Sequence, residues 1–173
     1  MVFEYALFGI LQGIFEWLPI SSQGNLVLIM TGIFGYAAET SLKYSIFLHS
    51  GTLVAALVYF RKDVFKILKN LKGYKPDFSG DNRLLTFLVV STIITGAIGY
   101  PIFKYIMLSN FAGEVLIGLV GLALITTGLI QKFSKTNGLK TEHNLSLKDS
   151  IVLGIAQGFS AIPGISRSGI TVS

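Results

Sequence analysis

Polar side chains that could bind or cleave a phosphate ester interrupt two otherwise apolar stretches of the sequence. The first stretch holds Gln12, Glu16, Ser21 and Ser22 around Pro19. Gln12 and Glu16 are four residues apart, so on a helix an amide and a carboxyl group would share one face. Such groups are costly in hydrocarbon unless they pair or face a cavity. This stretch is therefore a candidate site.

The second stretch contains an arginine between two serines, Ser166, Arg167 and Ser168, followed by Gly169. A guanidinium presents five donors in a planar fork, which suits bidentate recognition of phosphate. Backbone N–H groups at the start of a helix after each interruption would add anion contacts. A carboxylate, serines and an arginine together can bind and hydrolyse a phosphate ester or anhydride, but these residue types do not specify which.

The two stretches are copies of each other. Residues 9–13 match residues 154–158, and residues 20–24 match residues 165–169, with the same offset of 145 in both cases. The matched segments are Gly9-Ile-Leu-Gln12-Gly13 with Gly154-Ile-Ala-Gln157-Gly158, and Ile20-Ser-Ser-Gln-Gly24 with Ile165-Ser-Arg-Ser-Gly169. We interpret this as an internal duplication.

The composition indicates a membrane protein. Hydrophobic residues make up 51% of the 173 residues and charged residues only 13%, about half the charged share of soluble domains. Uncharged runs approach or reach the length of a membrane span at 17–38, 44–60, 84–103 and 115–131. The absence of cysteine excludes disulfides, thiol chemistry and cysteine-based metal sites.

The elements follow from these runs. The run at 17–38 is broken by Pro19 and its polar neighbours, so residues 1–38 are predicted to form a re-entrant helix hairpin whose irregular backbone lines a cavity. About three spanning helices follow, at 44–60, 84–103 and 115–131. Residues 150–173 begin a second hairpin. The prediction is a single, partial, all-α integral membrane domain over 1–173.

The net charge of +5 is concentrated in two segments between spans. The predicted loop 61–83 holds seven Lys or Arg against three Asp, and the loop 132–149 holds four Lys against two acids. The positive-inside rule makes both loops cytoplasmic. Three spans then separate the hairpins, so the duplicated motifs enter from opposite faces, as in an inverted-topology repeat with its site near the midplane.

The motifs resemble those of the undecaprenyl-diphosphatase family, also called the bacitracin-resistance protein family. The resemblance covers essentially the whole chain and rests on three segments: Gln12-Gly-Ile-Phe-Glu16-Trp-Leu-Pro-Ile-Ser-Ser22-Gln-Gly-Asn25, His49-Ser-Gly-Thr-Leu-Val-Ala-Ala-Leu-Val-Tyr-Phe-Arg61 and Pro163-Gly-Ile-Ser-Arg-Ser-Gly169. It implies a multi-pass hydrolase of the cell membrane that removes the terminal phosphate of a polyprenyl diphosphate, regenerating the lipid carrier of cell-envelope glycans.

The resemblance also implies the site. Glu16, Ser22 and Arg167 are the expected catalytic residues, with Glu16 also a ligand of a divalent cation, Mg²⁺ or Ca²⁺. The expected partners are the lipid substrate and the membrane but no nucleic acid, and a homodimer is left open. The residues expected to bind phosphate are Ser21, Gln12, Asn25, Ser166, Ser168 and Gly169, and His49 and Gln157 are secondary candidates.

Two positions depart from the family pattern. Gln12 stands where the bacterial motif commonly has a first Glu, and Asn25 stands where the family has a His that is often assigned a catalytic role. Family members also continue for several more helices, so we expect the sequence to be a fragment. Two other readings stay open: a lipid-phosphate flippase on the same inverted repeat, and a non-catalytic remnant, which these departures favour.

Overall fold

The computed structural model describes residues 2–78, 82–109, 113–134, 141 and 144–172, and no strand occurs among them. The all-α prediction is therefore confirmed. In chain order the elements are α1 (Val2–Phe15), α2 (Ser22–Gly32), α3 (Ala38–Tyr59), α4 (Arg61–Asn70), a short 3₁₀ turn η1 (Leu71–Gly73), α5 (Asn82–Leu108), α6 (Gly113–Phe133), α7 (Leu147–Phe159) and α8 (Arg167–Val172).

Among the described residues, three helices, α3, α5 and α6, are long and apolar enough to cross a membrane. They correspond to the predicted spans at 44–60, 84–103 and 115–131, and each begins earlier than its uncharged run. Many of their large apolar side chains point outward, among them Phe47 and Leu122. In water such a surface would be unfavourable, whereas lipid tails cover it. The chain is an integral membrane protein.

The first predicted hairpin contains α1 and α2, separated by a break at residues 16–21. Pro19 lies in this break. Because proline has no N–H, it would remove a backbone hydrogen bond inside a helix, and in the break it does not. Ser21 then caps α2, because its hydroxyl accepts a hydrogen bond from Gly24 N at 3.2 Å. Phe8 of α1 and Leu26 of α2 are almost fully buried in one apolar cluster that α3 also contacts. The hairpin is thereby fixed against the first span.

The second predicted hairpin begins at α7, three residues before the expected start at 150. A capping box between Ser146 and Asp149 starts this helix. α7 then packs along α5, where Thr95 Oγ1 donates to the carbonyl of Gly154 at 3.2 Å. After the break at 160–166 the chain turns into α8.

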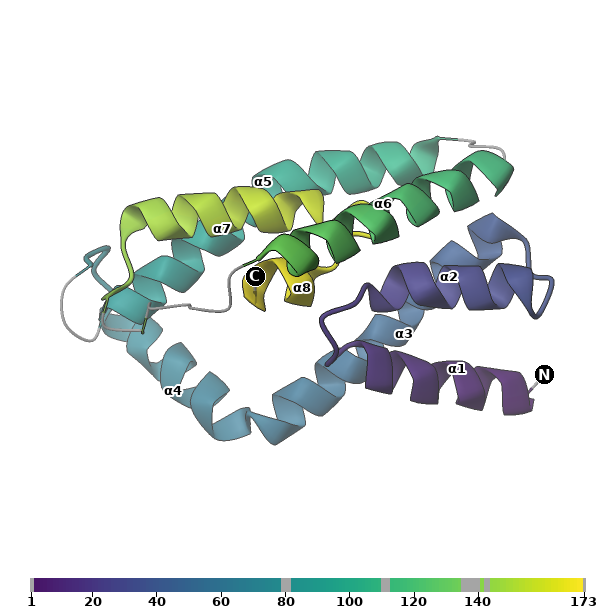
Figure 1. The fold of residues 1–173 in the computed structure, drawn as a ribbon. Helices are drawn as coiled ribbons and strands as arrows, with labels where there is room; N and C mark the ends of the chain where they lie inside the picture. Colours follow the sequence, from purple (N-terminus) through teal and green to yellow (C-terminus); the bar gives the residue numbers. More distant parts are fainter. Residues whose placement is uncertain (1, 79–81, 110–112, 135–140, 142–143, 173) are drawn as a thin grey trace.

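Figure 1 shows that α1 and α7 run in opposite directions and that the segments after them meet in the middle of the molecule. α6 passes alongside this meeting point and contacts both α2 and α8. This arrangement is consistent with the predicted inverted repeat. The orientation of the hairpins relative to a membrane stays a prediction.

One prediction about the loops is wrong. Residues 61–83 were predicted to be a loop, but α4 and η1 occupy the first part of this segment. The lysine-rich composition led to the loop prediction, but lysine itself favours helix. The apolar residues between the lysines also recur with a helical period. In the second predicted loop, 132–149, positions 135–140 and 142–143 lie outside the described residues.

Candidate active site

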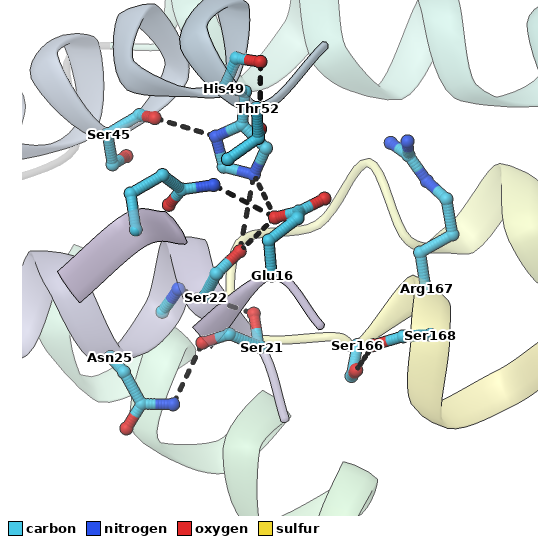
Figure 2. A network of polar contacts seen from close by, with 12 residues as sticks. Glu16, Ser21, Ser22, Asn25, Ser45, His49, Thr52, Ser166, Arg167 and Ser168 are labelled. Atoms are coloured by element: carbon cyan, nitrogen blue, oxygen red, sulfur yellow. Dashed lines mark hydrogen bonds and ion pairs between the residues drawn. The ribbon is translucent and has the colours of Figure 1, made fainter. Parts of the chain in front are cut away.

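Ser22 lies at the centre of a polar cluster (Figure 2). Its hydroxyl donates to Glu16 Oε2 at 2.6 Å and lies 3.3 Å from His49 Nε2. Glu16 Oε2 and His49 Nε2 are also 3.3 Å apart. A hydroxyl in contact with a carboxylate and an imidazole has two groups beside it that can accept its proton.

Glu16 is held by the end of α1. Its backbone N–H donates to Gln12 O at 3.0 Å, which places its side chain one turn beyond that of Gln12. Gln12 Nε2 donates to Glu16 Oε2 at 2.9 Å, and the predicted shared face is therefore confirmed. Gln12 is buried, and its Oε1 has no hydrogen-bond partner among the described residues. An unpaired buried amide oxygen is uncommon, and here it belongs to the residue that hydrogen-bonds to Glu16.

His49 extends into the cluster from α3, and a hydrogen bond on the far side of its ring fixes the orientation of the ring. Its Nδ1–H donates to the carbonyl of Ser45 at 2.7 Å, one helical turn earlier. Since a carbonyl only accepts, Nδ1 carries a proton; Nε2 is an acceptor when the ring is neutral, and it donates to Glu16 Oε2 when the ring is protonated. The structure thus directs Nε2 at Ser22 and Glu16.

The second break supplies the opposite side of the same pocket. Figure 2 shows Arg167 extending from the start of α8 beside the cluster. Arg167 Nε donates to Ser160 Oγ at 3.4 Å, and the guanidinium is otherwise exposed to the pocket mouth. The pocket is lined by Glu16, Ile20, Ser21, Ser22, Gln23, His49, Ser160, Ile165, Ser166, Arg167 and Ser168.

The duplicated residues adopt the same local structure in both copies. Ser166 Oγ accepts from Gly169 N at 2.9 Å, as Ser21 Oγ accepts from Gly24 N. Each serine therefore caps the start of a helix. Because of this equivalence, Ser22 and Arg167 are both the first residue of the helix that follows a break.

α6 connects the two breaks through its side chains. Thr127 Oγ1 donates to the carbonyl of Gly164 at 3.1 Å and accepts from Ser166 N at 3.1 Å. Gln131, one turn later, donates through Nε2 to the carbonyl of Pro19 in the first break. One face of α6 thus fixes the relative positions of Ser22 and Arg167.

The breaks also touch each other directly. A Cβ added at Gly24 would lie 2.8 Å from Gly164 Cα, so neither backbone leaves room for a larger residue there. Gly164 has a φ of +103°, which residues with a side chain rarely adopt. Ser168 Oγ donates to the carbonyl of Leu18 at 2.9 Å. Gly24 therefore permits a close approach between α2 and the backbone of the second break.

Most predicted site residues meet at the pocket, but four do not line it, and one of these, Gln12, contacts the cluster only through its hydrogen bond to Glu16. Asn25 lies apart from Glu16 in Figure 2, and its Nδ2 donates to the carbonyl of Ser21 at 2.8 Å. Gln157 donates to Thr171 Oγ1 at 3.2 Å. Gly169 contributes its N–H to the cap on Ser166 and not to the pocket. Asn25 is a structural residue of the turn in this arrangement.

Some residues of the site were not predicted from the sequence. Ser160, Thr127 and the carbonyl of Ser45 each contact a predicted site residue, and Gln131 bonds to Pro19 in the first break. Thr127 and Gln131 are four residues apart at the end of an apolar span, and this spacing was the one signal in the sequence that they share a face.

Comparison with known proteins agrees with the resemblance. The model of the family described as bacitracin resistance protein BacA matches residues 5–173. A protein named undecaprenyl-diphosphatase from Methanococcoides burtonii is 42% identical over 98% of this chain and 65% of its own length. Proteins of the same name from Saccharolobus islandicus and Haloarcula marismortui are 38% and 36% identical, each over 96% of this chain and 60% and 63% of their own lengths.

The chain therefore spans somewhat less than two thirds of the relatives that it matches. No solved structure matches it. The match to the family model covers nearly the whole chain, and the three quoted motifs fall within it. The chain belongs to the bacitracin resistance protein BacA family.

Proposed function

We propose that the protein containing this chain hydrolyses the terminal phosphate of a polyprenyl diphosphate. The observation that carries the proposal is the hydroxyl of Ser22, which contacts both Glu16 and His49 while Arg167 lines the same pocket. The name undecaprenyl-diphosphatase of the relatives supports a polyprenyl diphosphate as substrate. The membrane-embedded fold supports a lipid substrate, since a prenyl tail can lie between helices while its head group occupies the pocket.

In the proposed reaction, Arg167 binds the diphosphate head group and balances its charge. The oxygen of Ser22, or of a water molecule that Ser22 orients, attacks the terminal phosphorus. The proton of the attacking group passes to His49 Nε2 or Glu16, which both lie within reach of Ser22 Oγ. The bond to the bridging oxygen breaks, and polyprenyl phosphate leaves. If Ser22 attacks, water then hydrolyses the phosphoserine to release inorganic phosphate and regenerate the hydroxyl.

We also propose a divalent cation, Mg²⁺ or Ca²⁺, at Glu16. The pocket offers the oxygen donors that these cations prefer, namely the Glu16 carboxylate and the serine hydroxyls. Within the described part of the chain no three His, Asp or Glu side chains lie close enough together to hold a metal. Phosphate oxygens of the substrate would supply the remaining ligands, and the cation would neutralise developing negative charge.

The decisive experiment measures phosphate release from polyprenyl diphosphate by the full-length natural protein, purified and reconstituted. We expect release that depends on a divalent cation and falls at least about a hundredfold in Ser22→Ala. A matched control is Ser109→Ala, which removes a hydroxyl directly after α5, outside the pocket, and should leave phosphate release unchanged. Wild-type protein that moves lipid phosphate across the bilayer without releasing phosphate would replace the hydrolase with a flippase.

Phosphate release by the Glu16→Gln variant separates the role of the carboxylate from the role of the pocket shape. Because the amide keeps the shape but cannot accept a proton or carry charge, substrate should still bind while kcat falls. Equal kcat in the variant and the wild type would remove Glu16 from both proposed roles.

A further inference from the structure

α4 has two faces of opposite character. Lys62, Lys66 and Lys69 are spaced four and three residues apart and so lie on one side of the helix, with Asp63 at the edge of that side. The opposite side carries Val64, Ile67 and Leu68 and continues into Leu71, and Phe65 lies between Leu68 and Lys69 around the helix. Such segregation is typical of helices that lie at a boundary between an apolar and a charged environment.

The described chain covers the apolar side of α4 only in part, at Val64 and Ile67. No residue of α4 is buried, and the exposed fractions of Phe65 and Leu68 are 70% and 56%. Placed in water, two large apolar side chains one turn apart would be unfavourable. The apolar side therefore needs another partner.

The position of α4 identifies the environment. α3 is long and apolar enough to span the membrane, and α4 begins two residues after its last residue, Tyr59, with a change of direction that is visible in Figure 1. Tyr59 is largely exposed, and Trp17 packs near Phe60, so aromatic rings gather where α3 ends. Tyrosine and tryptophan are enriched at the level of the lipid head groups. α4 thus starts at the membrane surface.

We propose that α4 lies in the head-group layer of the cytoplasmic leaflet and binds acidic phospholipids. Its apolar side chains reach the upper acyl chains, and its three lysines contact phosphate groups. A leaflet containing anionic lipid offers both environments at this depth, and it attracts clustered lysines near the end of a spanning helix. Nucleic acid or an acidic protein would satisfy the lysines but leave Phe65 and Leu68 uncovered.

The orientation is tested with single cysteines in the full-length protein, in a background without other cysteines and in nanodiscs. Leu68→Cys and Lys66→Cys, which lie on opposite sides of α4, each carry a fluorophore that lipids brominated in the acyl chain can quench. We expect at least threefold stronger quenching at position 68 than at position 66. Equal quenching at both positions, whether strong or absent, overturns the proposal; absence at both would mean that another part of the protein covers α4.

The lipid preference is tested with the same label at position 68. Brominated phosphatidylglycerol should quench at least about twofold more strongly than brominated phosphatidylcholine at equal content, and the difference should shrink at high salt. Replacing Lys62, Lys66 and Lys69 with Gln should abolish the difference, whereas the control Lys104→Gln with Lys132→Gln should keep it. Equal quenching by both lipids at low salt, in the labelled protein that keeps all three lysines, would overturn the role of acidic lipid.

Discussion

Ser22 and Arg167 occupy equivalent positions of the two duplicated stretches, yet they carry different chemistry. Each is the first residue of the helix after a break, and each preceding serine caps that helix. The shared backbone geometry directs both side chains to one pocket. One copy can therefore present a hydroxyl while the other presents a positive charge, a combination that two identical copies would not provide.

Arg167→Lys tests the fixed geometry of that positive charge. A guanidinium can bind two phosphate oxygens at once through a planar fork, which an ammonium cannot reproduce. We expect kcat/KM for polyprenyl diphosphate to fall at least about a hundredfold, about 2.7 kcal/mol, the effect of removing one preorganised donor from a developing charge. Steady-state phosphate release gives the value. A change below threefold would mean that Arg167 does not clamp the diphosphate.

Asn25→His tests whether a histidine at position 25 is needed for the reaction or whether His49 already has its role. His49 already directs Nε2 at Ser22, and Asn25 is held by the carbonyl of Ser21 outside the pocket. We therefore expect no gain in kcat from Asn25→His, while His49→Gln should lower kcat about a hundredfold, the lower end of the contribution of a positioned proton acceptor. A severalfold gain from Asn25→His would show that position 25 can reach the reacting atoms.

α6 is the element that turns two separate breaks into one site. Thr127 and Gln131, on one face of this span, bond to the second and the first break respectively. The sequence predicted the spans, the first hairpin and the meeting of the breaks, because hydrophobic runs and a duplication are patterns of the sequence itself. The role of α6 was not predictable, since a lone Thr and Gln at the end of an apolar helix carry no signal of what they contact.

Thr127→Val should disturb this connection without removing a group of the pocket. The substitution leaves the buried N–H of Ser166 without its acceptor, which typically costs about 1–3 kcal/mol. We expect a lower unfolding temperature and a roughly tenfold lower kcat/KM, because Arg167 follows Ser166 directly. Thr127→Ser keeps the hydroxyl and should retain both properties. Unchanged kcat/KM in the valine variant would contradict a positioning role.

Across the whole molecule, the hairpins lie at the two ends of a common site. α1 and α7 approach it in opposite directions, with three spanning helices between the hairpins along the chain. The duplication and the charge of the loops predicted this arrangement. The side-chain directions within it were not predictable, as Asn25 and Gln157 illustrate. Asn25 follows a duplicated segment directly and Gln157 lies within one, yet both bond to their own surroundings instead of the pocket.

The membrane orientation of the hairpins is testable by cysteine labelling in the full-length protein, in a background without other cysteines. Lys69 at the end of α4 and Lys148 at the start of α7 should both react with a membrane-impermeant thiol reagent only from the cytoplasmic side, and Glu39 at the start of α3 only from outside. The reason is that two basic segments flanking one pair of spans are both retained inside. Leu122, an apolar residue in the middle of α6, is the control and should react from neither side. Reaction of positions 69 and 148 from different sides would show that α1 and α7 enter the membrane from the same face, and the inverted repeat would then be excluded.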